Sequence, residues 1–281
     1  MDTAHHNQSS AGIPTCCISA DKNVGDTADK NVCATRFAGM LLSLCIWFLS
    51  VFIRVHLWLK TKSPSILTRR PELLLFVLAV CVANAPLLTG HCWQALTFQP
   101  EAVRAGQWWR LLTHPFVHVS WYHLLLDGAA FFVLYHSLLE RSSGRRLALV
   151  FGSAIGSLAA AWSSPTAATG LCGLSGVAHG LMAVSAIELL STHRPHSAER
   201  RVGLATFAFV VAKAGYEALS GHMFFAFLDF GLLGSPVAVS HAGGIIGGIT
   251  TAFFLSSGRT HIPNNLRPET MSHSGFKMRM M

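Results

Sequence analysis

Two glycine-rich segments decide how this sequence is interpreted: Gly173-Leu174-Ser175-Gly176, which opens one apolar stretch, and His241-Ala242-Gly243-Gly244, which opens a later one. Each segment places one reactive side chain, a serine or a histidine, in a run that is otherwise hydrophobic. A serine becomes a nucleophile when a histidine base accepts its proton, and inside a bilayer both would have to lie on helices. The pair therefore predicts a serine hydrolase site between two membrane helices.

The composition supports a membrane location. Apolar residues make up 51% of the 281 residues and charged residues only 12%, and the mean hydropathy is positive, which few water-soluble domains of this length tolerate. The net charge of +8 is spread over several connections instead of forming one basic stripe, which argues against nucleic-acid binding. We expect a multi-pass protein of the lipid bilayer that binds no nucleic acid.

Six apolar runs are long enough to cross about 30 Å of hydrocarbon. They are predicted near Glu72–Leu88, Val119–Leu139, Leu147–Ser163, Ala168–Leu190, Gly203–Ser220 and Pro236–Leu255. The chain then divides into a disordered polar tail (residues 1–36), a candidate extra transmembrane helix (37–60), a six-helix bundle (71–257) and a cytoplasmic tail (258–281). The predicted fold class is an all-α membrane protein.

The basic residues predict the orientation. Lys and Arg gather in alternate connections, whereas the opposite connections hold only Arg104 and Arg110. The positive-inside rule places the basic set in the cytoplasm, so that Ser175 and His241 face the outer side. Counted inward from the predicted span ends at 1.5 Å per residue, both lie roughly 8–11 Å below the outer surface.

A third polar group precedes and enters the Val119–Leu139 span, and its last three members bracket the predicted depth of Ser175. The group consists of His114, His118, His123 and Asp127. Because His114 and His118 share a helical face, zinc binding with Asp127 is an alternative to catalysis. A single serine or histidine in a membrane helix can also bond its own helix or relay protons.

Small residues at intervals of four predict close approach of the serine and histidine helices. The pairs are Gly176/Gly180, Gly243/Gly247 and Gly244/Gly248. Such pairs let two backbones pack closely, as a hydrogen bond of about 3 Å between serine and imidazole requires.

These motifs together resemble the rhomboid family of intramembrane serine proteases over roughly Pro71–Ser256. They comprise Gly173-Leu174-Ser175-Gly176, His241 with Gly244 and Gly248, the His118, His123 and Asp127 array, and the Trp109-Arg110 pair. The resemblance implies a dyad in which Ser175 is the nucleophile and His241 the base, with no cofactor and no metal. It also implies an oxyanion site made by the Ser175 amide, His118 and the residue at 127, with His123, His179 and the glycines in support.

Two positions depart from the usual pattern of that family. His179 stands where a tyrosine commonly stacks on the catalytic histidine, and it resembles the rhombosortase branch, as do the intramembrane Lys213 and Glu217. Lys213 and Glu217 are spaced to pair on one helix, and a purely structural ion pair is the simpler interpretation. Asp127 replaces an asparagine, and a carboxylate beside an oxyanion must be protonated, turned away or paired with a histidine.

Two outer features remain open on the sequence. The loop Gly221–Ser235 is rich in phenylalanine and would be either a mobile lid or an interfacial segment. Cys92 and Cys172 both lie at the outer edge of a span and would form a disulfide or remain buried thiols.

The predicted function is an intramembrane endopeptidase that cleaves transmembrane segments or glycine-rich C-terminal anchors of membrane proteins near the outer face. The expected location is the bacterial inner membrane, with the site open to the periplasmic side. The alternative is a catalytically inactive rhomboid-like protein that binds transmembrane helices. A transporter that uses the buried charges as a proton path would need inverted repeats, which the sequence does not show.

Overall fold

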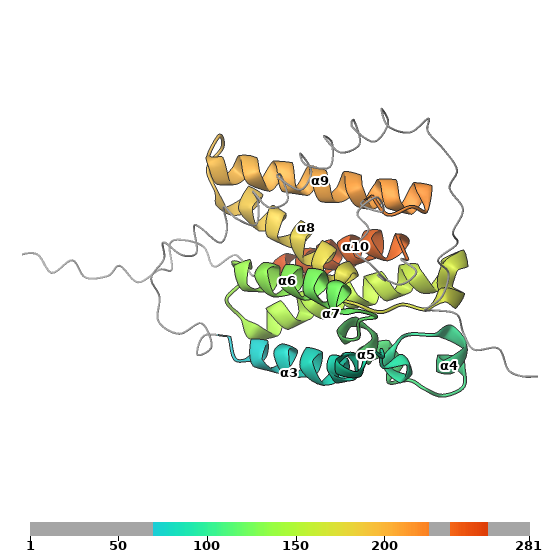
Figure 1. The fold of residues 1–281 in the computed structure, drawn as a ribbon. Coiled ribbons are helices and arrows are strands. Elements are labelled where there is room, and N and C mark those ends of the chain that lie inside the picture. Colours follow the sequence, from blue (N-terminus) through green and yellow to red (C-terminus); the bar gives the residue numbers. More distant parts are fainter. Residues whose placement is uncertain (1–69, 225–236, 258–281) are drawn as a thin grey trace, which may run out of the picture.

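The computed structural model describes residues 70–224 and 237–257 (Figure 1). The predicted tail over 1–36, the candidate helix over 37–60, most of the Gly221–Ser235 loop and the tail over 258–281 lie outside these residues.

Helices account for the described fold. The long helices are α3 (Glu72–Asn84), α6 (Trp121–Ser137), α7 (Ser143–Trp162), α8 (Ser175–Thr192), α9 (Ala198–Ser220) and α10 (Val239–Ser257). The short ones are η1 (Ala85–Thr89), η2 (Gln94–Leu96), α4 (Pro100–Arg104), α5 (Arg110–Thr113), η3 (His114–Phe116) and η4 (Pro165–Thr169). Among the described residues, β-type pairing is limited to one isolated antiparallel bridge between Phe98 and Leu171. The predicted all-α class is confirmed.

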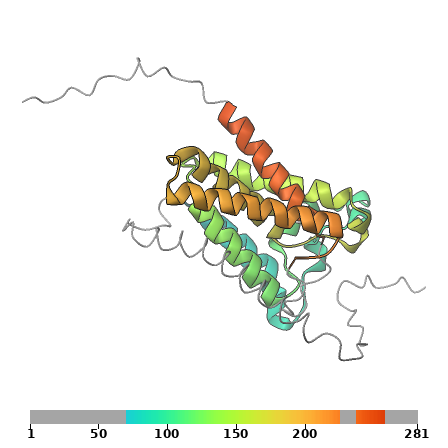
Figure 2. The same ribbon diagram turned by 90° about the horizontal axis from the view of Figure 1, so that it is seen from above.

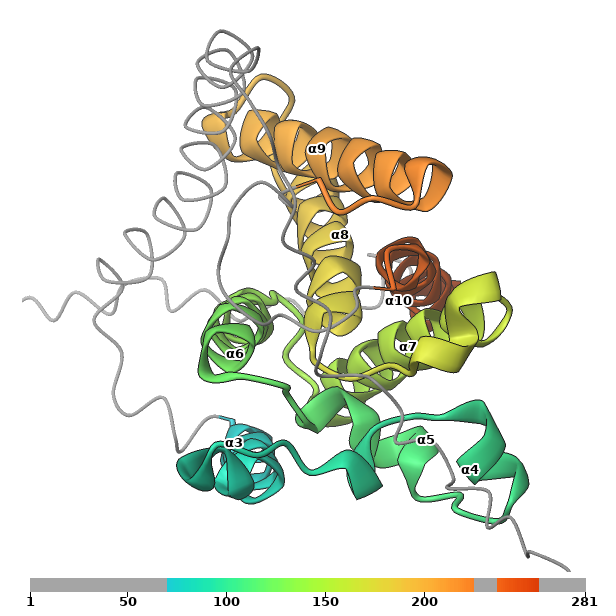
Figure 3. The same ribbon diagram turned by 45° about the vertical axis from the view of Figure 1, so that its right-hand side comes forward.

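Helix α8 occupies the centre of the bundle. It packs against α6, α7, α9 and α10, which surround it in Figure 3. Between Gly176 and Ala186 every residue except His179 is buried. A helix enclosed by protein must be apolar or small on all sides, and this stretch is. The nucleophile candidate therefore begins the helix that has the most protein around it.

Glycines hold α7, α8 and α10 in direct backbone contact. A methyl group at Gly156 of α7 would lie 2.3 Å from the carbonyl oxygen of Gly243 on α10, and one at Gly180 of α8 would lie 2.5 Å from that of Gly244. These distances leave no room for a Cβ atom, so the helices touch because the side chains are absent. The predicted close approach of α8 and α10 is confirmed, and α7 joins it.

Three helical stretches are long and apolar enough to span a membrane by themselves: Glu72–Thr89, Ala198–Ser220 and Val239–Ser257. A fourth candidate is the pair Arg110–Phe116 and Trp121–Ser137, which is bent by 94°. The inner helices α7 and α8 contain the charged residues Arg145, Arg146 and Glu188, which lower their hydropathy. Several of their small residues are buried against other helices: Ser153, Ser157, Gly176, Gly180 and Ser185. Figure 2 shows the C-terminal end of α10 projecting beyond the bundle, where Phe253 and Phe254 are exposed.

The predicted span Ala168–Leu190 starts too early. Residues Pro165–Thr169 form the short helix η4, Leu171 pairs with Phe98, and α8 begins only at Ser175. Leu171 and Leu174 precede the helix, but their apolar side chains are buried in the protein. Their hydropathy therefore made the predicted span begin too early. A depth for Ser175 counted from Ala168 along a helix is therefore wrong.

A buried ion pair joins the start of α3 to α7. The guanidinium of Arg146 bonds the carboxylate of Glu72, which also accepts a hydrogen bond of 3.0 Å from the Tyr135 hydroxyl. Arg146 and Glu72 are almost fully buried. This network fixes the end of the bundle at which α3 begins.

Candidate active site

Ser175 is the first residue of α8, and a turn at Gly173 with positive φ precedes it. Gly173 has φ +93°, which L-residues with a side chain rarely adopt, and a Cβ there would lie 2.6 Å from His123 Nε2 and 2.7 Å from Asp127 Oδ2. The Gly173 N–H donates to the carbonyl of His114 at 3.0 Å. Glycine is therefore required at position 173 for both backbone and space. Because Ser175 starts a helix, its amide N–H belongs to the end that has no intrahelical acceptor.

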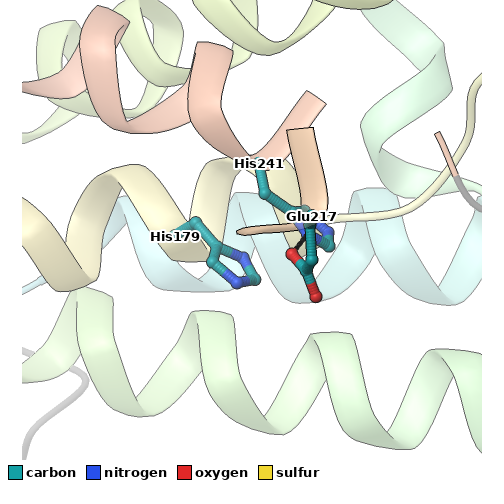
Figure 4. Close-up of side chains that lie close together, drawn as sticks. All are labelled: His179, Glu217 and His241. Carbon is teal, nitrogen blue, oxygen red and sulfur yellow. Dashed lines mark hydrogen bonds and ion pairs between the residues drawn. The ribbon is translucent and has the colours of Figure 1, made fainter. Parts of the chain in front are cut away.

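His241 lies in the first turn of α10 and is 3% exposed. The approach of α10 to α8 brings it beside the start of α8, since a Cβ on Gly176 would lie 3.2 Å from the Ser240 carbonyl oxygen. The His241 ring stacks on that of His179 with centroids 3.9 Å apart and an interplanar angle of 12°. His179 therefore holds the base from the side, in the place expected from the sequence (Figure 4).

Glu217 of α9 makes the shortest contact of the candidate base. Its Oε2 lies 2.7 Å from His241 Nδ1 (Figure 4). Its Oε1 accepts from Lys213 Nζ at 2.7 Å and from the backbone N–H of Phe224 at 3.0 Å. The Lys213–Glu217 pair was expected from the spacing on one helix. The bond to His241 was not, because spacing within α9 carries no information about α10.

The partners of the imidazole rings define where their protons lie. His179 Nδ1 is 2.7 Å from the Ser175 carbonyl oxygen and must donate to it, so its Nε2 accepts from Lys213 Nζ at 2.9 Å. His241 Nδ1 faces a carboxylate oxygen and must also carry a proton. The Nε2 lone pair of His241 is thereby left to accept a proton.

Asp127 contacts Ser175 from α6, which packs against α8. Its Oδ2 accepts from the Ser175 backbone N–H at 3.0 Å, lies 3.0 Å from His123 Nε2 and is 3.8 Å from His118 Nε2. Of the three outcomes considered for this carboxyl group, the structure shows pairing with a histidine. Asp127 Oδ2 therefore already accepts the hydrogen bond from the Ser175 N–H, which is the group expected to stabilise an oxyanion.

His118 is fully buried, and its Nε2 has no hydrogen-bond partner within residues 70–224 and 237–257. The rest of the residue is held by Asn84, whose Oδ1 accepts from the His118 backbone N–H at 2.8 Å and lies 3.3 Å from ring Nδ1. Asn84 is itself fixed by donating to the carbonyls of Val80 and Phe116 at 2.7 Å. No signal in the sequence pointed to Asn84, which is the last residue of α3.

His114 does not join this cluster. Its Nδ1 lies 3.2 Å and 3.1 Å from the carbonyl oxygens of Arg110 and Leu111 in its own connection. The zinc site considered from the sequence is thus not assembled. A different trio, His179, Glu217 and His241, has ligand atoms within 4.8 Å of one another. The Lys213 ammonium already bonds two of these three residues, and its charge opposes a second cation.

Ser175 and His241 make no hydrogen bond to each other in the described part of the chain, where Ser175 bonds through its backbone N–H and C=O. Such bonds are often long in substrate-free sites and tighten on binding. The arrangement nonetheless places a serine at a helix N-terminus, an oriented imidazole on a helix packed against it, and a buried nitrogen, His118 Nε2, that has no hydrogen-bond partner among the described residues. These are the parts that acyl transfer uses.

Comparison with known proteins gives one match. The family model of the rhomboid domain matches residues 105–258, which is more than half of the chain and contains every residue of the cluster except Asn84. Neither a curated protein nor a solved structure matches the chain.

Proposed function

The chain belongs to the rhomboid family, and on that premise we propose that it is an active intramembrane serine endopeptidase. As a rhomboid protein with long apolar helices it is an integral membrane protein. The observation that carries the proposal is the position of Ser175 at the start of α8, beside a His241 ring whose Nδ1 is bonded and whose Nε2 is available.

The chemistry follows from these positions. Ser175 Oγ attacks the scissile carbonyl carbon while His241 Nε2 accepts the hydroxyl proton, and the same proton later passes to the leaving amine as the C–N bond breaks. The tetrahedral oxyanion is stabilised by the Ser175 N–H. His118 Nε2 can add a second donor once it carries hydrogen, which requires an imidazolium or the loss of the 3.3 Å contact between Nδ1 and Asn84 Oδ1. His118 suits this role because its buried Nε2 has no partner among the described residues.

We propose that the substrates are membrane proteins with a transmembrane or glycine-rich C-terminal anchor. The stacked His179 supports the rhombosortase-like branch for which such anchors are the proposed substrates. The test uses the full-length protein in liposomes with two reporters, one with a glycine-rich anchor and one with the glycines replaced by leucine. We expect cleavage near the outer end of the glycine-rich anchor, at least tenfold faster than in the leucine reporter. Equal rates would contradict the assignment to the rhombosortase-like branch. Cleavage of neither reporter would contradict the proposal that the protein is an endopeptidase.

One observation favours the alternative of an inactive protein that binds transmembrane helices. The Ser175 amide is already bonded to Asp127, and a carboxylate at this point opposes a developing negative charge. An active enzyme must displace Asp127 when the substrate carbonyl enters.

Asp127→Asn therefore distinguishes the two. We expect kcat to rise roughly tenfold, because an asparagine binds the amide less strongly and adds donors that a carboxylate lacks. Steady-state cleavage of the reporter measures this, with the exposed Glu101→Gln as a charge-matched control. A loss of activity in Asp127→Asn alone would mean that the carboxylate orients His123 or His118 instead.

We further propose that the site opens to the outer, periplasmic side of a bacterial inner membrane. In a background without native cysteines, Ser163→Cys should react with an impermeant thiol reagent added to intact cells, and Pro195→Cys should not. Both positions are exposed. Ser163 directly follows the end of α7, before α8 begins, and Pro195 follows the end of α8. The reverse labelling pattern would place the active site at the cytoplasmic face and contradict the charge rule.

A further inference from the structure

We propose that Glu217 is a positioning residue for the reaction, so that this chain works with a Ser175–His241–Glu217 triad in place of an unassisted dyad. The inference rests on the proposed function and deepens it. Glu217 is 0% exposed, and its Oε2 lies 2.7 Å from His241 Nδ1. That is the distance of a strong charge-assisted hydrogen bond.

Both oxygens of the Glu217 carboxylate are hydrogen-bonded. Oε1 accepts from the Lys213 ammonium and from the Phe224 N–H, which keeps the group ionised and fixes its rotation. Within the described part of the chain, Oε2 bonds only His241. A carboxylate held in this way imposes the imidazole form with hydrogen on Nδ1, and so leaves the Nε2 lone pair available to accept the proton of the nucleophile.

The same carboxylate acts during catalysis without itself changing protonation. When His241 takes the Ser175 proton it becomes an imidazolium, and the adjacent negative charge of Glu217 stabilises it until the proton reaches the leaving amine. Glu217 gains and loses no proton in either step. This stabilisation exists in the transition state and not in the ground state, so it raises kcat rather than lowering KM.

Lys213 connects this acid to the other face of the base. Its Nζ bonds both Glu217 Oε1 and His179 Nε2. His179 in turn donates to the Ser175 carbonyl and stacks on His241. The His241 imidazole of α10 is therefore held by Glu217 of α9 and His179 of α8, and Lys213 bonds both of these residues.

A merely structural Glu217 would also join α9 to α10 through its bond to His241, and a matched control separates the two roles. Glu72 is another buried carboxylate bonded to a buried cation, Arg146, but it lies at the opposite end of α3 from Asn84. Its loss should lower the melting temperature without altering chemistry. Glu217→Gln should do both.

The experiment compares Glu217→Gln, Glu217→Asp and Glu72→Gln in the full-length protein in detergent, by reporter cleavage and by nitrogen-15 NMR of His241. We expect kcat in Glu217→Gln to fall about 10²- to 10⁴-fold with KM within threefold, as when an orienting acid is neutralised. Glu217→Asp should recover at least a tenth of the wild-type kcat, and Glu72→Gln should stay within threefold.

The NMR spectrum of wild type and of Ser175→Ala should show hydrogen on Nδ1 of His241. This reading does not depend on activity, so it tests Glu217 even if the endopeptidase proposal fails. It also serves if Glu217→Gln does not fold. Hydrogen on Nε2 in the wild type, or a Glu217→Gln variant with wild-type kcat, would overturn the inference.

Discussion

Replacing Ser175 or His241 by alanine is expected to lower turnover by at least about 10⁴-fold. The first change removes the nucleophile and the second removes the base, and no neighbouring side chain takes over either role. The fold should survive, since Ser175 holds its neighbours through backbone atoms. Reporter cleavage by purified protein measures the loss, and a melting curve in detergent checks the fold.

The matched control for Ser175→Ala is Ser153→Ala. Ser153 is a fully buried serine of α7 whose hydroxyl donates to the Leu149 carbonyl of its own helix at 2.8 Å. We expect its loss to leave kcat within threefold. Cleavage that persists in Ser175→Ala would place the nucleophile elsewhere.

The second large effect is expected at Gly244, which contains no reactive atom. A Cβ at this position would lie 1.9 Å from the Gly176 carbonyl oxygen and 2.7 Å from its carbonyl carbon. Because the obstacle is backbone, no rotamer change relieves it, and α10 must move away from α8. His241 is one turn before Gly244 and would move with it. A displacement on the order of 1 Å can cost about 100-fold in rate.

Gly244→Ala should therefore lower kcat at least about 100-fold and reduce stability by about 1–3 kcal/mol, as overpacking does. The matched control is Gly215→Ala on α9, where a Cβ meets nothing within 4 Å. That variant should keep wild-type kcat and melting temperature. Equal activity of the two variants would show that the contact between α8 and α10 does not position the base.

The parts of the site that sequence predicts are those that depend on one helix or on a repeated spacing. The glycines of α8 and α10 predict close packing by their interval of four. Lys213 and Glu217 pair on one helix because of the same interval. The glycine contacts and the Lys213–Glu217 pair were predicted because they depend on local periodicity. The stacking of His179 on His241 joins two helices, and it was expected only from the resemblance to the rhomboid family, in which a tyrosine commonly stands at this position.

What was missed depends on contacts between distant segments. The bond from Glu217 to His241 joins α9 to α10, and Asn84 reaches His118 from α3. Helix spacing alone does not reveal which faces meet. The start of α8 was misplaced for a related reason, since hydropathy does not distinguish Leu171 buried in a loop from a leucine in a helix.

Asp127 lies between these cases. The sequence identified it as the residue in conflict with an oxyanion, but left its partner open. The structure brings Asp127 to His123, four residues earlier on α6, and to the Ser175 amide on α8. The first contact follows from spacing, and the second required the packing of α6 against α8.

The assignment of Ser175 as nucleophile and His241 as base is tested most directly by covalent labelling. The probe is a fluorophosphonate that reacts with activated serines, and mass spectrometry locates the adduct. Wild-type protein is expected to carry the adduct on Ser175, and His241→Ala and Ser175→Ala are expected to carry none at that position. The Ser153→Ala control should label as wild type does. A folded wild-type protein that shows no adduct on Ser175, or an adduct that survives in His241→Ala at the wild-type rate, would contradict the assignment of Ser175 and His241 as nucleophile and base.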